Sequence, residues 1–111
     1  MKPANFTITT PANFKDWKNN HNTNGNGIDL FVENNYNTYA RFEWLCNCCL
    51  KQFKKYGGLD LDYLLNSSIL KDITRGARKA LAKYGEQYTM QEDKDARAAL
   101  VVSVWDYVTA E

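Results

Sequence analysis

Residues 39–56 read YARFEWLCNCCLKQFKKY, and their apolar positions recur with the period of an α-helix. One face of that helix carries Phe42, Leu45, Cys46, Cys49, Phe53 and Tyr56. Asn37 and Thr38 are candidate N-caps, because their side-chain oxygens can accept the free N–H groups of a first turn. The glycine pair at 57–58 ends the helix, since glycine enters the left-handed C-cap conformation without a Cβ clash. We therefore expect a long helix against which the other segments pack.

The opposite face of the same helix is aromatic and basic. It carries Arg41, Trp44, Cys48, Lys51 and Lys55, so Trp44 points away from Phe42. An exposed tryptophan flanked by cations is typical of a binding surface. The alternative, which the sequence favours, is that the N-terminal region folds over Trp44 and buries it.

Composition and charge predict one domain, residues 1–111, with a modest core. The net charge is +1, but residues 41–84 carry a net +5 and residues 85–111 a net −4. This asymmetry favours a partner that docks in one orientation. No apolar run is long enough to span a membrane, and no hydrophobic signal core is present. Three cysteines on one helix cannot pair easily, so we expect free thiols and a cytoplasmic protein.

The N-terminal third predicts short elements. Residues 5–10, NFTITT, and residues 28–32, IDLFV, are β-branched and predict two strands of a ribbon. Residues 11–20 predict a small helix with Thr10 as N-cap and Pro11 at its first position. Between the helix and the second strand, NNHNTNGNG is a loop, because Asn and Gly tolerate positive φ.

Two further segments after the central helix are predicted to be helical. Asp60 caps a short turn over 61–66, and Ser67 or Ser68 caps a helix over 69–84. Gly76 at the edge of its apolar stripe would permit close helix approach. The stripe comprises Ile69, Ile73, Ala77, Ala80, Leu81 and Tyr84, and the far face carries Lys71, Arg75, Arg78 and Lys79.

The last helix begins at a capping box, Thr89 to Glu92, and runs to about residue 108. Its main apolar face contains Leu100, Val104, Tyr107 and Val108, and a second face contains Ala98, Val102 and Trp105. The second face needs cover from the N-terminal segment, which we favour, or from a second copy in a homodimer. The predicted fold is therefore helix-dominated α+β: a short N-terminal β-ribbon and small helix, followed by three packed helices.

No motif for metal or catalytic chemistry stands out. Asn22, Asn24, Asn26 and Glu33 follow the spacing of a calcium loop, but only Glu33 supplies a carboxylate, so a polar turn is the better interpretation. Cys46 and Cys49 belong to the apolar face, where free cysteine acts as a small hydrophobe. The single histidine has no nucleophile signature beside it. We expect no metal, no cofactor and no enzymatic activity.

The predicted function is therefore that of a protein-binding module. The candidate partner-binding residues are Arg41, Trp44, Lys51, Lys55, Lys71, Arg75, Arg78 and Lys79. In type the chain resembles the small accessory proteins of phages and mobile elements: it is short, rich in Asn and Tyr, and lacks catalytic residues. That resemblance implies an inhibitor of a host defence or nucleic-acid-handling protein or ribonucleoprotein complex. The alternative is a direct nucleic-acid binder that uses a basic helical face.

Overall fold

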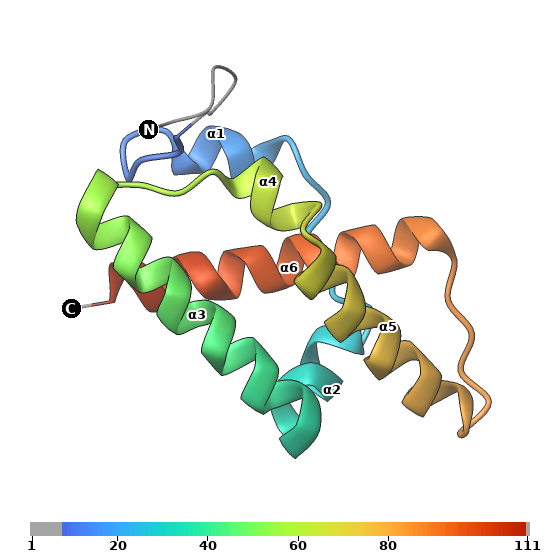
Figure 1. Cartoon of the computed structure of the whole chain (residues 1–111). Helices are drawn as coiled ribbons and strands as arrows, with labels where there is room; N and C mark the ends of the chain where they lie inside the picture. The colour runs from blue at the N-terminus through green and yellow to red at the C-terminus, as the bar shows by residue number, and fades with distance from the viewer. Residues whose placement is uncertain (1–7, 111) are drawn as a thin grey trace.

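The computed structural model describes residues 8–110, which form helices and no β-sheet (Figure 1). The helices are α1 Phe14–Asn19, α2 Ile28–Asn34, α3 Tyr36–Tyr56, α4 Leu61–Leu65, α5 Ser68–Ala82 and α6 Met90–Thr109. Together they form an elongated body with extents of 43 × 26 × 26 Å.

The predicted N-terminal β-ribbon is wrong, and so is the α+β class. Residues 28–34 form α2, in which Ile28 and Val32 are four residues apart and fully buried. That spacing places both side chains on one helical face. The other predicted strand, 5–10, lies partly outside the described residues. Within the described part, Thr9 makes only an isolated antiparallel bridge with Leu59.

Helix α6 is the element that the others surround. It crosses the middle of the molecule in Figure 1 and contacts α2, α3, α4 and α5. Its capping box forms as predicted: Thr89 Oγ1 accepts from the Glu92 N–H, and the Glu92 carboxylate accepts from the Thr89 N–H. Leu100, Val104 and Val108 of its main apolar face are buried, although Tyr107 of that face is 43% exposed, and residues of the same chain cover Trp105 on the second face. Phe14 stacks on the Trp105 ring at 4.7 Å, and Phe53 meets it edge-on at 5.6 Å.

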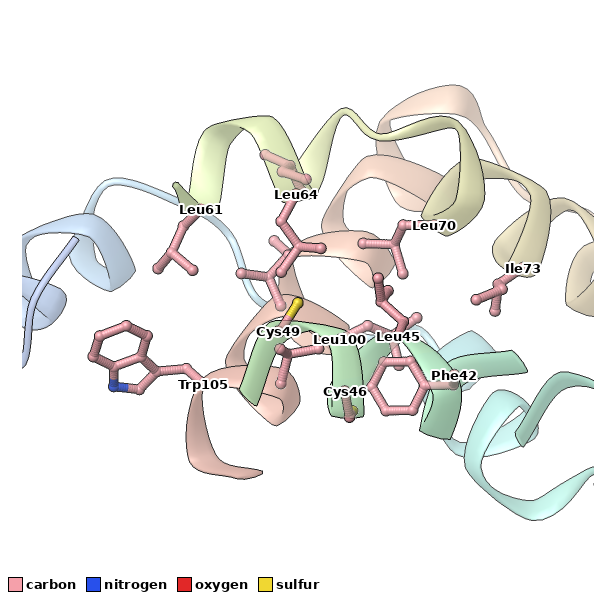
Figure 2. Packing of buried hydrophobic residues seen from close by; sticks show 14 of the residues in the cluster. Phe42, Leu45, Cys46, Cys49, Leu61, Leu64, Leu70, Ile73, Leu100 and Trp105 are labelled. Atoms are coloured by element: carbon pink, nitrogen blue, oxygen red, sulfur yellow. The ribbon is translucent and has the colours of Figure 1, made fainter. Parts of the chain in front are cut away.

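Helix α3 buries the predicted face over Phe42, Leu45, Cys46 and Cys49, whereas Tyr56 at its end was predicted on that face and is 40% exposed. Leu45, Cys46 and Cys49 lie in one cluster with Leu64 of α4 and Leu100 of α6 (Figure 2). The helix begins earlier than expected, because Asn35, and neither Asn37 nor Thr38, is the N-cap. It ends as predicted at Gly57, whose φ of 74° is the left-handed conformation.

The remaining helices follow their predicted caps with one exception. Asp60 caps α4, and Ser67 caps α5. The exception is α1, whose N-cap is Asn13, so the helix starts one turn after Thr10. Ile73 and Ala77 of the predicted α5 stripe are buried as expected, but Leu70 and Thr74 are buried beside them, so the buried face is rotated slightly from the prediction. Tyr84, which was assigned to the stripe, lies beyond the end of α5 and is 81% exposed.

Candidate functional site

A groove of about 1070 Å³ runs between α3, α4 and the start of α5. Its floor includes the buried side chains of Leu45, Cys49 and Leu64. Its more exposed walls include Trp44, Cys48 and Gln52 from α3, Tyr63 and Asn66 from α4, and Ile69 from α5. An apolar floor with a partly polar rim is typical of a ligand or peptide site.

Trp44 stands on the rim of this groove and is 58% exposed. The interpretation that the N-terminal region covers Trp44 is wrong. The aromatic residues of that region that the structure describes are used elsewhere: Phe14 stacks on Trp105, and the indole N–H of Trp17 donates to Asp62 Oδ1 at 2.9 Å. Trp44 is therefore a large, rigid aromatic surface left open to solvent.

Three predicted cations share this exposed face of α3. Arg41, Lys51 and Lys55 are all exposed, and none of them takes part in an ion pair within residues 8–110. The Lys55 ammonium lies 5.3 Å from the centre of the Tyr56 ring, a cation–π distance. The structure thus gathers Arg41, Trp44, Lys51 and Lys55 on one surface beside the groove.

The opposite wall of the groove carries carboxylates that already have partners. Asp60 Oδ1 accepts from the backbone N–H of Tyr63 at 3.0 Å and so caps α4. Asp62 Oδ1 accepts from Trp17 and lies 3.7 Å from His21 Nε2. The ring of His21 also stacks on Trp17, and its Nδ1 lies 2.7 Å from the Trp17 carbonyl. His21 is therefore part of the contact that fixes α1 to α4.

The basic stripe predicted on α5 is only partly free. Lys71 and Lys79 are exposed, and neither has an ion pair in the described part of the chain. Arg75 is exposed but pairs with Asp72 in the preceding turn. Arg78 was expected on the solvent face. Its Nε instead donates to Asp93 Oδ1 at 2.7 Å, and its side chain is only 26% exposed.

Asp93 belongs to a buried network that the sequence analysis missed. Its second oxygen accepts from Arg97 Nε at 3.0 Å, and Arg97 Nη1 donates to the Leu65 carbonyl at 2.7 Å. The i,i+4 spacing of Asp93 and Arg97 was a visible signal for this pair. Asp95 is buried as well and accepts from Asn22 and Gln91. Part of the C-terminal negative charge is therefore internal and does not face a partner.

The Asn-rich loop uses its amides for structure. Asn22 and Asn24 accept from backbone N–H groups two residues ahead, and Asn26 donates to the Glu92 carbonyl of α6. Residues 8–110 contain no group of three or more His, Cys, Asp or Glu side chains placed to hold a metal ion. The loop thus connects α1 to α2 and ties both to the start of α6.

The three cysteines fall into two environments. Burial raises the pKa of Cys46 to about 12 and that of Cys49 to about 11, because a thiolate loses its hydration in the core. Cys48 is half-buried and lines the groove. The core assignment of Cys46 and Cys49 is thus confirmed by their burial.

A smaller hollow of about 190 Å³ lies between α3 and α6. Tyr39 on its edge donates to Glu43 Oε2 at 3.1 Å, and this hydrogen bond, with the charge of Glu43, raises the Tyr39 pKa. Such a tyrosine holds its proton more firmly and is a poor nucleophile or base. The α3–α4 groove is therefore the stronger candidate site.

Gln52, Tyr63, Asn66 and Ile69 line the groove but were not among the binding residues predicted from the sequence. The exposure of Tyr63 could have been predicted from the sequence. Leu61, Leu64 and Leu65 share the buried face of a short helix, so Tyr63 between them points to solvent.

The chain matches no known protein family, no curated protein and no solved structure. No helix in the part that the structure describes has both the length and the apolarity needed to cross a membrane.

Proposed function

We propose that this chain is a non-enzymatic protein-binding module and that the α3–α4 groove holds its partner. The observation that carries the proposal is Trp44, a half-exposed indole on the rim of an apolar groove and on the same face as three cations. Tryptophan and arginine are enriched among the residues that dominate binding energies. Folding alone gives no reason to leave so large an apolar side chain in water.

The residues described supply little for catalysis. The imidazole of His21 is engaged with Trp17, and the buried thiols of Cys46 and Cys49 have raised pKa values. Catalytic thiols and other nucleophiles are usually activated by a lowered pKa, not by a raised one. These features favour binding over chemistry.

Direct nucleic-acid binding through α5 is the second candidate. Lys71 and Lys79 support it, but Arg75 and Arg78 already pair with carboxylates of the same chain. A homodimer through Trp105 is not part of the proposal, because Phe14 and Phe53 cover that ring. Inhibition of a host defence or nucleic-acid-handling complex stays a prediction from the type of sequence.

The test is affinity capture from nuclease-treated lysate of the cells in which the chain is made. The baits are the wild type, Trp44→Ala and Tyr84→Ala. Tyr84 is the matched control, because it is 81% exposed and does not line the groove. We expect a partner protein that the wild type and Tyr84→Ala retain and that Trp44→Ala loses. Both substitutions should leave the melting temperature nearly unchanged, as surface changes usually do.

Equal retention of the partner by Trp44→Ala would contradict the proposal. A partner retained only from a parallel lysate without nuclease treatment would also contradict it and would favour the nucleic-acid candidate.

A further inference from the structure

We infer that the groove takes an acidic peptide segment of the partner, with an apolar side chain as its anchor. This inference rests on the proposed function and names the chemistry of the partner. Three features carry it: the apolar floor, the free cations on the α3 side, and the carboxylates already engaged on the α4 side.

The anchor follows from the floor. Leu45, Cys49 and Leu64 line the groove and are buried, whereas Trp44 and Tyr63 line it and are exposed, Tyr63 to 76%. An apolar side chain of the partner that enters the groove would contact this floor and remove apolar surface of the exposed walls from water. Removing apolar surface from water favours binding.

The acidic character follows from the α3 side. With 3.6 residues per turn, Lys51 and Lys55 lie within about 20° of Trp44 around the helix axis. At 1.5 Å per residue they lie about 10 Å and about 16 Å from Trp44 along that axis. In an extended peptide at about 3.3 Å per residue, this matches carboxylates about three and five residues from the anchor. Arg41 lies on the other side of Trp44 and can take a further one.

A basic segment fits the groove poorly. Two carboxylates line it, Asp60 and Asp62, and one oxygen of each already accepts from a donor of this chain, Tyr63 N–H and Trp17 Nε1, which leaves only the second oxygen of each for a basic side chain. Arg41, Lys51 and Lys55 do not line the groove but lie on the exposed face of α3 beside it, where they would repel a positively charged peptide and attract an acidic one.

A nucleic-acid strand also fits less well than an acidic peptide. Its phosphates recur at every nucleotide, so the strand would bring negative charge against Asp62, whose side chain is 66% exposed. A peptide can confine its carboxylates to the α3 side of the groove.

The experiment uses the full chain and fluorescein-labelled pools of short peptides. Each pool has a central apolar pair and degenerate flanks that are acidic, basic or neutral, and a labelled single-stranded DNA is tested beside them. Fluorescence anisotropy at physiological salt measures binding. We expect the acidic pool to bind most tightly, and Trp44→Ala to abolish its binding.

Charge reversal locates the cations. The double variant Lys51→Glu/Lys55→Glu should weaken binding of the acidic pool about tenfold, since two exposed attractive pairs are lost and two repulsive ones replace them. The matched control is Lys79→Glu/Lys83→Glu, which reverses two exposed cations of the α5 region outside the groove. That control should change affinity less than twofold.

Equal binding of the three pools, a preference for the basic pool, or an unchanged affinity of Lys51→Glu/Lys55→Glu would each overturn this inference. Those results leave the proposed function standing where the capture experiment has shown a Trp44-dependent protein partner. Trp44-dependent binding of the DNA without binding of the acidic pool would overturn both.

Discussion

Asp93 ties three helices together through a single carboxylate. One oxygen accepts from Arg78 of α5, the other accepts from Arg97 of α6, and Arg97 reaches the carbonyl of Leu65 at the end of α4. Asp93 and Arg97 are almost completely buried. Because a buried ion needs its partner, this network is sensitive to the loss of any one member.

Replacement of Asp93 by Asn should therefore lower the free energy of unfolding by about 3 kcal/mol, because Arg97 would remain buried without a counter-charge. Urea denaturation measures the loss. Asp106→Asn on the exposed side of α6 is the control and should change stability by less than about 0.5 kcal/mol. Equal stability of the two variants would mean that the ion network contributes nothing to folding.

The cysteines differ in reactivity because they differ in burial. The thiolate is the nucleophile, so the raised pKa values of Cys46 and Cys49 should protect them from alkylation at neutral pH. Cys48 on the groove wall should react first. Peptide mapping by mass spectrometry after brief treatment with iodoacetamide measures the order. Protection of all three thiols to the same degree would contradict the half-buried position of Cys48 on the groove wall.

The same two thiols predict a pH dependence of stability. Their folded pKa values, about 12 and about 11, lie above the ordinary value of 9.0. Their contribution is therefore complete below pH 9 and is lost as the pH rises towards 11–12, because the unfolded chain releases protons first. Between pH 8 and pH 10.5 the wild type should lose about 4 kcal/mol more stability than a Cys46→Ala/Cys49→Ala variant, because the unfolded chain releases both thiol protons in that range while the folded chain keeps most of them. Parallel urea titrations at the two pH values compare them.

Among the helices, α2 and α5 show what local pattern leaves open. The sequence IDLFV is β-branched, yet Ile28 and Val32 are also one helical turn apart, and packing against α3, α5 and α6 selects the helix. In α5 the apolar residues are compatible with two buried faces that differ by a small rotation about the helix axis. Contact with α2, α3 and α6 selects the orientation of α5 in which Leu70 and Thr74 are buried.

Gly76 provides a test of which face of α5 is buried. The sequence suggested that it allows close helix approach, but a Cβ there would meet no atom within 4 Å. Gly76→Ala should therefore stabilise the protein by about 1 kcal/mol, as expected at an exposed helix interior. Gly57→Ala is the contrasting variant and should destabilise, because φ at Gly57 is +74°. Thermal melting distinguishes the two. A loss of stability in Gly76→Ala would place a neighbouring helix against that face.

Across the whole molecule, the placement of the three tryptophans separates core from surface. Trp17 and Trp105 are buried, and Trp44 is open. Phe14 of α1 covers Trp105 of α6, so the N-terminal and C-terminal parts of the chain share one core. Covering Trp105 in this way leaves Trp44 free.

Trp105→Glu should unfold the protein, because an unpaired charge would be buried between Phe14 and Phe53. Circular dichroism and light scattering measure the outcome. Trp105→Phe keeps the apolar contact and should remain folded with a lower melting temperature. A folded Trp105→Glu variant that changes from dimer to monomer would instead show that a second copy covers this face.

Local sequence was sufficient for the existence and the ends of most helices. Residues within a few positions of each other determine helix caps, helix stops and the apolar face of a helix, so these features could be predicted. They include the caps at Asp60, Ser67 and Thr89, the stop at Gly57 and the buried face of α3. The candidate cations Arg41, Lys51 and Lys55 and the indole of Trp44 follow from the same helical period. The groove beside them could not be predicted, because it is formed by α3, α4 and α5 together.

Contacts between distant residues decided the rest. The helical state of residues 28–34, the inward turn of Arg78 towards Asp93, and the cover of Trp105 by Phe14 each depend on groups at least fifteen positions apart in the chain, or on whole neighbouring elements. Such pairings compete with alternatives of similar local energy. Only the closing of a common core, which buries apolar surface and pairs buried charges at once, selects among them.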